Sequence, residues 1–203
     1  MIPNFLSRII TPLTSTKMGV TPSHTGITGS PITLPANHQK AIFAAGCFWG
    51  VEHIFRKHFP GLHSLRVGYI GGSTTSPTYR AVCSGSTGHA EAVLLVYDES
   101  KTPYRELVEF FYRMHDPTTA NRQGPDVGTQ YRSAIYYTSE EQRKTAEEVT
   151  RGKASKWWAP QGSVKTEVVE AGEWWDAEDY HQRYLDNNPG GYECPSHFVR
   201  NFQ

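Results

Sequence analysis

The residues with the clearest chemical potential form one short motif, Gly46-Cys47-Phe48-Trp49-Gly50. The apolar run before it predicts a short buried strand, and apolar residues at helical spacing after it predict a helix. Cys47 is therefore expected at a strand-to-helix turn, where the helix dipole and free backbone N–H groups make a thiol more thiolate-like. The glycines would allow a sharp turn and close approach of a substrate. The two aromatic rings could wall a small apolar pocket. The motif thus indicates a reactive cysteine, although a lone cysteine is more often a buried structural residue.

Four other unusual local sequences fall between predicted strands, where sites are usually built. Glu91 stands at the start of an apolar strand, a placement that indicates a desolvated carboxyl, with a solvated strand end as the alternative. The connection 116–130 is long enough to be functional in its own right. Cys194 follows a helix-breaking, glycine-containing stretch that gives the backbone freedom. The four sequences are Pro77-Thr78-Tyr79-Arg80, Gly88-His89-Ala90-Glu91, Asp126-Val127-Gly128-Thr129-Gln130-Tyr131-Arg132 and Gly190-Gly191-Tyr192-Glu193-Cys194.

Composition narrows the class of protein. The chain has 203 residues, 37% hydrophobic and 12% aromatic, which suits one globular domain with an additional segment. Lys+Arg and Asp+Glu are 20 each, so nothing indicates the basic face of a nucleic-acid-binding protein. No run approaches the roughly 20 apolar residues of a membrane span. The three cysteines are too few and too scattered for a secreted disulfide framework or a zinc site, so we expect no metal and a reducing, cytoplasmic location.

The first 38 residues differ from the rest. They are rich in Thr, Ser, Pro and Gly, and the first acidic residue of the chain is Glu52. We expect a disordered extension, with a mitochondrial targeting peptide as the alternative, although the arginine content is thin for one. The predicted domains are therefore 1–38, a disordered or targeting extension, and 39–203, the catalytic domain.

Hydrophobic periodicity predicts alternating strands and helices over residues 39–203. Thr102 with Pro103 and Ser139 with Gln142 are typical of helix starts. Asp176 is expected to cap a last helix. Because a helix follows most strands, the fold class is α+β, a two-layer sandwich whose mixed sheet has flanking helices and a long C-terminal coil. Strands are predicted at 40–45, 62–69, 90–97, 133–138 and 165–170, and helices at 49–58, 103–114, 139–158 and 176–185, with a short helical turn within 77–88.

Over about residues 40–203 the sequence resembles the A-type peptide methionine sulfoxide reductases, with a tail like that of fungal members. Several short sequence motifs of the family, found in the right order, are far more specific than any single motif. The matching stretches are Gly46-Cys47-Phe48-Trp49-Gly50, Pro77-Thr78-Tyr79-Arg80, Cys83-Ser84-Gly85, Thr87-Gly88-His89-Ala90-Glu91, Asp116-Pro117, Gly128-Thr129-Gln130-Tyr131-Arg132-Ser133 and Asn188-Pro189-Gly190-Gly191-Tyr192.

The resemblance implies a role for each matching position. Cys47 would attack the sulfoxide sulfur, and Glu91 would protonate the oxygen, which requires a raised pKa. Tyr79 and Tyr131 would hydrogen-bond that oxygen as neutral phenols. Asp126 would act as an orienting acid close by.

The resemblance also implies the substrate pocket and the recycling of the enzyme. Phe48 and Trp49 would enclose the substrate's methyl group. Cys194 would condense with the sulfenic acid left on Cys47, and thioredoxin would reduce the disulfide. The implied partners are thioredoxin, oxidised proteins and free methionine sulfoxide, with preference for the S epimer. We expect no bound cofactor, no nucleic-acid or membrane partner, and a monomer.

Other interpretations remain open on the residues themselves. A cysteine hydrolase or acyl transferase would pair Cys47 with a histidine, for which His53 and His89 are available. A non-enzymatic redox sensor would form only a regulatory disulfide. Cys83 is expected to be a buried structural thiol rather than the resolving one. Without the resemblance, the two tyrosines would be interpreted as ordinary core phenols and Glu91 as a solvated strand end.

Overall fold

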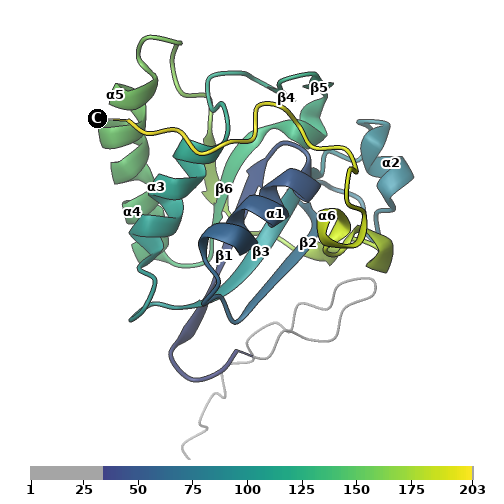
Figure 1. Ribbon diagram of the computed structural model, residues 1–203, viewed down its shortest axis with the longest axis horizontal. Coiled ribbons are helices and arrows are strands. Elements are labelled where there is room, and N and C mark those ends of the chain that lie inside the picture. Colours follow the sequence, from purple (N-terminus) through teal and green to yellow (C-terminus); the bar gives the residue numbers. More distant parts are fainter. Residues whose placement is uncertain (1–33, 203) are drawn as a thin grey trace, which may run out of the picture.

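The computed structural model describes residues 34–202, built around a six-stranded sheet in the order β7-β6-β1-β3-β2-β8 (Figure 1). β6 and β7 run parallel, whereas the pairs β1–β3, β1–β6, β2–β3 and β2–β8 are antiparallel. The predicted mixed sheet is therefore confirmed. The strands are β1 (His38–Ala45), β2 (Ser64–Ile70), β3 (Ala90–Asp98), β6 (Ser133–Tyr137), β7 (Glu167–Glu170) and β8 (Trp175–Asp176).

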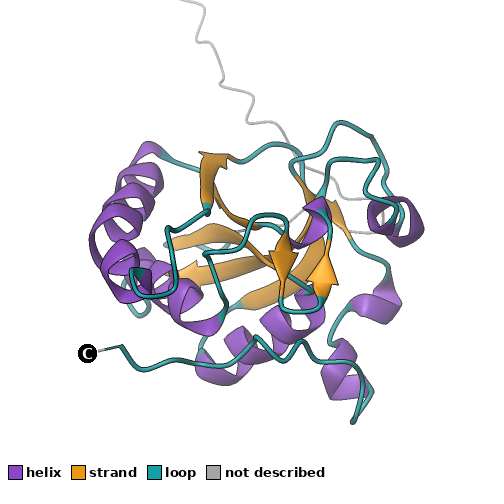
Figure 2. Cartoon of the chain, turned by 90° about the horizontal axis from the view of Figure 1, so that it is seen from above, coloured by secondary structure: helices purple, strands orange, loops and turns teal. Residues whose placement is uncertain are grey.

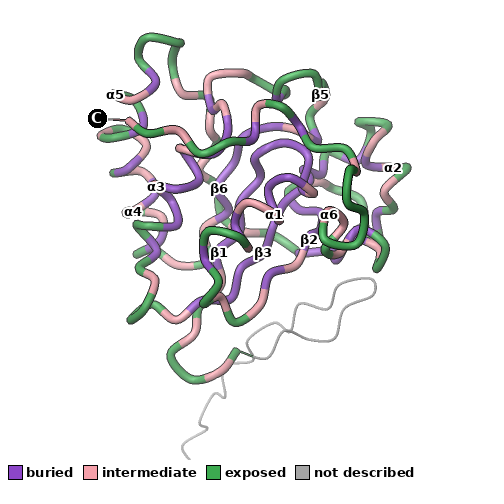
Figure 3. The backbone as a smooth tube through the Cα atoms, in the orientation of Figure 1, coloured by how far each residue is buried: buried purple, intermediate pink, exposed green. Residues whose placement is uncertain are grey.

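Helices α1 (Phe48–His58), α3 (Tyr104–Met114) and α4 (Glu140–Val149) contribute to the hydrophobic core on one face of the sheet (Figure 2). Since side chains alternate along a strand, Phe43 of β1 joins this core while Ile42 joins a smaller cluster on the other face. Residues 90–97 of β3 are buried, as their apolar run predicted, and β1, β3 and the start of α1 form the buried centre (Figure 3). The α+β two-layer prediction is confirmed.

Most of the helix starts predicted from local residues agree with the structure. Ser139 Oγ accepts the N–H of Gln142 at 3.2 Å, as predicted for the start of α4. This helix continues through a π-helical turn, η2 (Thr150–Ala154), into α5 (Ser155–Trp158). Helix α3 begins one residue later than expected, with Pro103 rather than Thr102 as its N-cap.

The prediction of a helix capped by Asp176 is wrong. Asp176 lies in β8, where its buried carboxylate pairs with Arg66 and accepts the Trp174 indole N–H at 2.7 Å. These tertiary contacts override the capping signal. The chain then forms a 3₁₀ turn, η3 (Asp179–His181), and a short helix, α6 (Tyr184–Asn187), separated by Arg183 in the left-handed conformation (φ 56°).

Several short elements surround the carboxyl end of β1. The connection 116–130 contains a hairpin of β4 (Arg122–Gln123) and β5 (Asp126–Val127), followed by the 3₁₀ turn η1 (Thr129–Tyr131). Helix α2 (Tyr79–Cys83) is the short helical turn expected within 77–88. No helix within residues 34–202 combines the length and apolar character needed to cross a membrane. Most of the predicted extension 1–38 lies outside the described residues.

Candidate active site

Cys47 is the N-cap residue of α1, directly after Gly46, whose φ of +95° makes the sharp turn out of β1. Its side chain is a free thiol and is 6% exposed. Burial raises the pKa of Cys47, the charge of Glu91 raises it further, and the backbone N–H of Trp49 acts in the opposite direction. The expectation of a thiolate-like Cys47 is therefore wrong for this state, because desolvation outweighs the helix-start effect.

Glu91 lies on β3 beneath the first turn of α1 and is 1% exposed. Its Oε2 accepts the backbone N–H of Phe48, the neighbour of Cys47, at 3.0 Å, while Oε1 has no hydrogen-bond partner among the described residues. Burial raises the pKa of Glu91 to about 8, and the charge of Asp126 adds to this. The predicted desolvated carboxyl is confirmed, and this pKa favours its protonated form at neutral pH.

Tyr79 and Tyr131 come from different elements and remain half-buried. Tyr79 begins α2, where its backbone N–H donates to Glu178 Oε1 at 2.9 Å, and Tyr131 ends η1. Burial raises the pKa of both phenols, and the charge of Glu91 is the next cause for each. The same charge also raises the pKa of Cys47. The carboxyl of Glu91, the thiol of Cys47 and the phenols of Tyr79 and Tyr131 therefore lie close to one another.

Asp126 connects this cluster to the C-terminal segment. Its charge raises the pKa of Glu91, Cys47 and Tyr131. Its Oδ1 accepts the hydroxyl of Tyr192 at 2.8 Å, and its Oδ2 is buried without a partner among the described residues. Asp126 is thus an acidic neighbour of the site, as expected, and also an anchor for the tail.

The two aromatic residues after Cys47 take different positions. Phe48 is buried at 1% exposure, with its ring centre 5.9 Å from that of Tyr69 and 6.4 Å from that of Tyr79. Trp49 is half-buried and stacks on Tyr184 at 3.8 Å between ring centres. Phe48 therefore forms the floor of an aromatic group in which Trp49 is the more accessible wall.

His181 and Glu178 contact this aromatic group, and the sequence did not indicate either of them. The indole N–H of Trp49 donates to His181 Nδ1 at 3.0 Å, so the proton of that ring is on Nε2. Glu178 accepts the Tyr69 hydroxyl at 2.8 Å besides the N–H of Tyr79. Because 176–185 was predicted as one helix, nothing in its pattern indicated these contacts.

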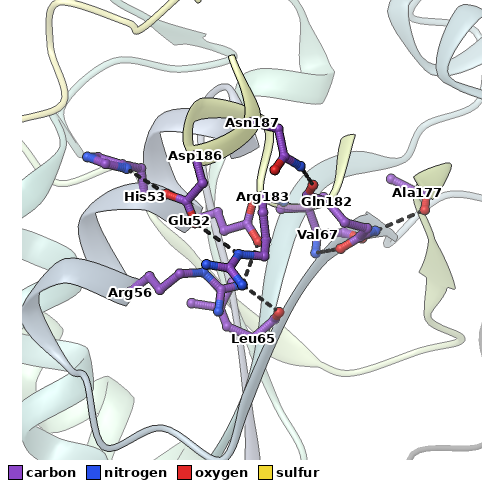
Figure 4. A network of polar contacts seen from close by, with 10 residues as sticks. All are labelled: Glu52, His53, Arg56, Leu65, Val67, Ala177, Gln182, Arg183, Asp186 and Asn187. Atoms are coloured by element: carbon purple, nitrogen blue, oxygen red, sulfur yellow. Dashed lines mark hydrogen bonds and ion pairs between the residues drawn. The ribbon is translucent and has the colours of Figure 1, made fainter. Parts of the chain in front are cut away.

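A buried polar network holds this segment against α1 and β2 (Figure 4). Glu52, 2% exposed, pairs with Arg56 at 2.8 Å and accepts the backbone N–H of Arg183 at 2.8 Å. Gln182 exchanges hydrogen bonds with the backbone of Val67, accepting from its N–H at 3.0 Å and donating to its carbonyl at 2.9 Å. The network thereby fixes His181 and Tyr184 against Trp49.

The other two cysteines both lie near the cluster. Cys194 is fully buried and donates its S–H to the carbonyl of Gln123 at 3.4 Å, and a charge on it raises the pKa of Cys47. Cys83 ends α2 and is half-buried, not fully buried as predicted. Burial raises the pKa of Cys83, its interaction with Tyr79 lowers it, and the charge of Glu91 raises it again, so this thiol lies close to Tyr79.

The histidines needed for a hydrolase are engaged elsewhere. Both ring nitrogens of His89 contact the 72–74 loop, at 3.1 Å from the N–H of Gly72 and 2.8 Å from the carbonyl of Thr74. His53 lies 3.6 Å from Asp186 on the outer side of α1. Within residues 34–202, no group of three or more His, Cys, Asp or Glu side chains is arranged to hold a metal ion.

Residues 39–201 match the family described as peptide methionine sulfoxide reductase. The chain belongs to this family. A probable peptide methionine sulfoxide reductase of Schizosaccharomyces pombe is 52% identical over 165 residues, covering 80% of this chain and 96% of the relative.

Solved structures of this reductase family share the fold. Reduced Mxr1 of Saccharomyces cerevisiae is 40% identical, with a TM-score of 0.75, over 82% of this chain and 94% of that one. Mxr1 in complex with Trx2 is 27% identical, with a TM-score of 0.56, over 84% and 96% of the two chains. The chain is accordingly an oxidoreductase that reduces methionine sulfoxide.

Proposed function

We propose that the chain reduces the S epimer of methionine sulfoxide, free or in proteins, through a sulfenic acid on Cys47 and a Cys47–Cys194 disulfide that thioredoxin reduces. The observation that carries this proposal is the buried, protonated Glu91 bonded to the backbone beside Cys47. A neutral carboxylic acid next to a thiol can protonate an acceptor while the sulfur attacks.

In the first step, Glu91 protonates the sulfoxide oxygen as the Cys47 sulfur attacks the substrate sulfur, and the proton that leaves the Cys47 thiol restores the carboxyl of Glu91. The oxygen passes to Cys47, so methionine is released, its sulfur reduced by two electrons and that of Cys47 oxidised to sulfenic acid. The hydroxyls of Tyr79 and Tyr131 are neutral donors close to the charge of Glu91 and can hydrogen-bond this oxygen. Removing one such donor typically raises the barrier by about 2.7–4 kcal/mol.

In the second step, the Cys194 sulfur attacks the sulfenic sulfur. The S–O bond breaks, the hydroxyl leaves as water, and a Cys47–Cys194 disulfide remains. Thioredoxin then exchanges its dithiol for this disulfide and restores both thiols. The complex of Mxr1 with Trx2 supports this choice of reductant. All the electrons come from thiols, so the cycle needs no bound cofactor or metal.

The preference for one epimer would follow from a fixed arrangement of two pockets around Cys47. Phe48, Trp49 and Tyr184 supply aromatic rings and Glu91 supplies a proton donor, while Tyr79 contributes both a ring beside Phe48 and a hydroxyl. Only one hand of a sulfoxide can place its methyl among the rings and its oxygen at the donors while presenting sulfur for attack.

The deciding measurement is NADPH oxidation with thioredoxin, thioredoxin reductase and each resolved methionine sulfoxide epimer. We expect turnover with the S epimer alone, and no turnover of Cys47→Ser with thioredoxin or with dithiothreitol. Equal consumption of both epimers would contradict the two-pocket arrangement, and activity of Cys47→Ser in dithiothreitol would place the nucleophile elsewhere.

The resolving thiol is identified by separating the two steps. Cys194→Ser should release about one methionine per enzyme, stall as a sulfenic acid, and resume with dithiothreitol. The matched variant Cys83→Ser should turn over nearly normally with thioredoxin. A Cys47–Cys83 bond found by mass spectrometry, with full turnover of Cys194→Ser, would assign the role to Cys83 instead.

A further inference from the structure

The backbone conformation of Gly50 does not require glycine. It lies in the first turn of α1 with ordinary helical backbone, where alanine would favour the helix more strongly. A methyl group there would, however, meet His197 Nδ1 at 2.4 Å. A methyl group on Gly46 would likewise meet His197 Nε2 at 3.2 Å and Gln123 Cβ at 2.6 Å. The two glycines that flank Cys47 therefore form a cradle for residues far away in the sequence.

His197 fills this cradle. Its ring is 5% exposed, and Nε2 lies 2.7 Å from the carbonyl of Ala45, to which it donates its proton. Nδ1 then carries only a lone pair and has no hydrogen-bond partner among the described residues. The ring thus joins the C-terminal segment to the end of β1, two residues before Cys47.

The same turn of chain carries the proposed resolving thiol. The backbone N–H of His197 donates to the carbonyl of Cys194 at 3.0 Å, which closes the turn. Cys194 donates its S–H to the carbonyl of Gln123, whose side chain packs on Gly46. Cys194 therefore contacts Gln123, which packs on Gly46, and His197 contacts Ala45. Both ends of the turn are thus held by residues around Cys47.

We infer that His197 is a positioning residue that docks the 194–197 turn at Cys47, with Gly50 as its receptor. This inference rests on the proposed resolution of the Cys47 sulfenic acid by Cys194. The glycine-containing stretch before Cys194 leaves the thiol on a flexible tether, and docking by His197 removes that freedom. Holding two reacting groups in place raises their effective concentration strongly.

The test follows both steps after reduced enzyme is mixed with one equivalent of methionine sulfoxide. Methionine release reports the first step, and loss of dimedone-reactive sulfenic acid together with formation of the disulfide reports the second. For His197→Ala we expect methionine release within about twofold of normal and disulfide formation slowed about 10- to 100-fold. His197→Gln should recover much of the rate, since its amide can reach the Ala45 carbonyl.

The control variant is Glu193→Gln, an exposed tail residue adjacent to Cys194, and it should form the disulfide at the normal rate. If His197→Ala resolves as fast as the parent enzyme, or if both steps slow equally, the positioning role is refuted. If the parent enzyme itself forms no Cys47–Cys194 disulfide, it is the proposed function that fails, so the two failures can be distinguished.

A double-mutant cycle tests the cradle without relying on one variant. Gly50→Ala should displace His197 and slow disulfide formation as His197→Ala does. In the His197→Ala background, Gly50→Ala should have little further effect, because the group it displaces is gone. If the two slowing factors multiply instead, Gly50 does not act as the receptor of His197.

Discussion

Glu91 acts through its charge on Cys47, Tyr79 and Tyr131. That charge is the second cause, after burial, of the raised pKa of Cys47, Tyr79 and Tyr131. Below about pH 8 the carboxyl is neutral, so it does not oppose negative charge forming on the cysteine sulfur. In the proposed mechanism, the protonation of this one side chain therefore controls both the proton supply and the ease of attack.

We predict that the single-turnover rate of sulfoxide reduction falls as the pH rises through about 8, the pKa of Glu91. The protonated form is the donor, so the rate is highest below this pKa and is lost above it. If attack required prior ionisation of Cys47, whose pKa is raised, the thiolate fraction would grow with pH across this range and the rate would rise and then level off above 8 instead of falling. Rapid-quench measurement of methionine release from pH 6 to 9.5 tests this.

In the same experiment, Glu91→Gln should lower the rate by about 10²- to 10⁴-fold and remove the decline near pH 8. The amide keeps the size and the hydrogen bond to Phe48 but cannot transfer the proton. A decline that persists unchanged in Glu91→Gln would belong to another group.

The sequence predicted single residues well where their surroundings were local. Glu91 at the head of an apolar strand was expected to be desolvated, and it is. The pKa of Cys47 was predicted in the wrong direction, because burial of the thiol depends on chain segments that meet only in the fold. His197 and Gln123 could not have been inferred for the same reason, since they contact Gly46 across 151 and 77 positions of sequence.

At the scale of elements, the packing of η3 and α6 on α1 determines the shape of the aromatic group. Glu52 connects the two by accepting the N–H of Arg183 while paired with Arg56. Trp49 then lies between Tyr184, on which it stacks, and His181, to which it donates. A change on the buried side of α1 should therefore reach the substrate through Trp49.

We predict that Glu52→Gln lowers the free energy of unfolding by about 1–3 kcal/mol, because it removes a buried charge that accepts two hydrogen bonds. We also expect KM for methionine sulfoxide to rise more than kcat falls, since the Trp49 wall loosens while Cys47 and Glu91 stay in place. Urea unfolding and steady-state kinetics measure the two effects.

The matched control is Glu148→Gln on α4, whose pair with Arg105 is exposed on both sides. It should change the free energy of unfolding much less than Glu52→Gln does and leave KM unaltered. Equal effects of the two substitutions would show that the network of Glu52 does not act on the pocket.

Elements with complete local signals were predictable, and those that depend on tertiary pairing were not. Ser139 and Gln142 mark the start of α4 through their own hydrogen bond. Asp176 has an equally good capping side chain, but Trp175 and Asp176 pair with β2 as an edge strand. The β4–β5 hairpin was seen only as a long functional connection, because two-residue strands are too short for periodicity to reveal.

At the scale of the whole molecule, buried neutral histidines tie the tail and α3 to the sheet. The ring nitrogens of His115 lie 2.6 Å from the carbonyl of Phe111 and 2.7 Å from Ser133 Oγ. Burial lowers the pKa of His115 to about 3 and that of His197 to about 4. In the unfolded chain both would bind a proton near the ordinary value of 6.5.

We predict that stability is greatest above pH 6.5 and falls as the pH drops toward 4. In this window the unfolded chain binds protons that the folded chain excludes, so each histidine removes up to about 1.4 kcal/mol per pH unit. His115→Gln should reduce this slope by one histidine. Urea unfolding of the parent protein and of this variant at pH 4.5, 5.5 and 6.5 provides the comparison, and identical slopes in the two proteins would contradict it.

The two ends of the described chain differ in how they tolerate a fusion partner. The eight residues of β1 place His38 about 23 Å from Ala45, at the end of the strand next to Cys47. The other end is fastened down, with Phe202 stacked on Trp157 at 5.2 Å and the backbone of Arg200 bonded to Arg113 (Figure 1). A purification tag or fluorescent reporter joined after Gln203 would pull on the segment that carries Cys194. Fusions for pull-down or imaging therefore belong at the amino-terminal end, and carboxyl-terminal ones would report a slower enzyme than the cell contains.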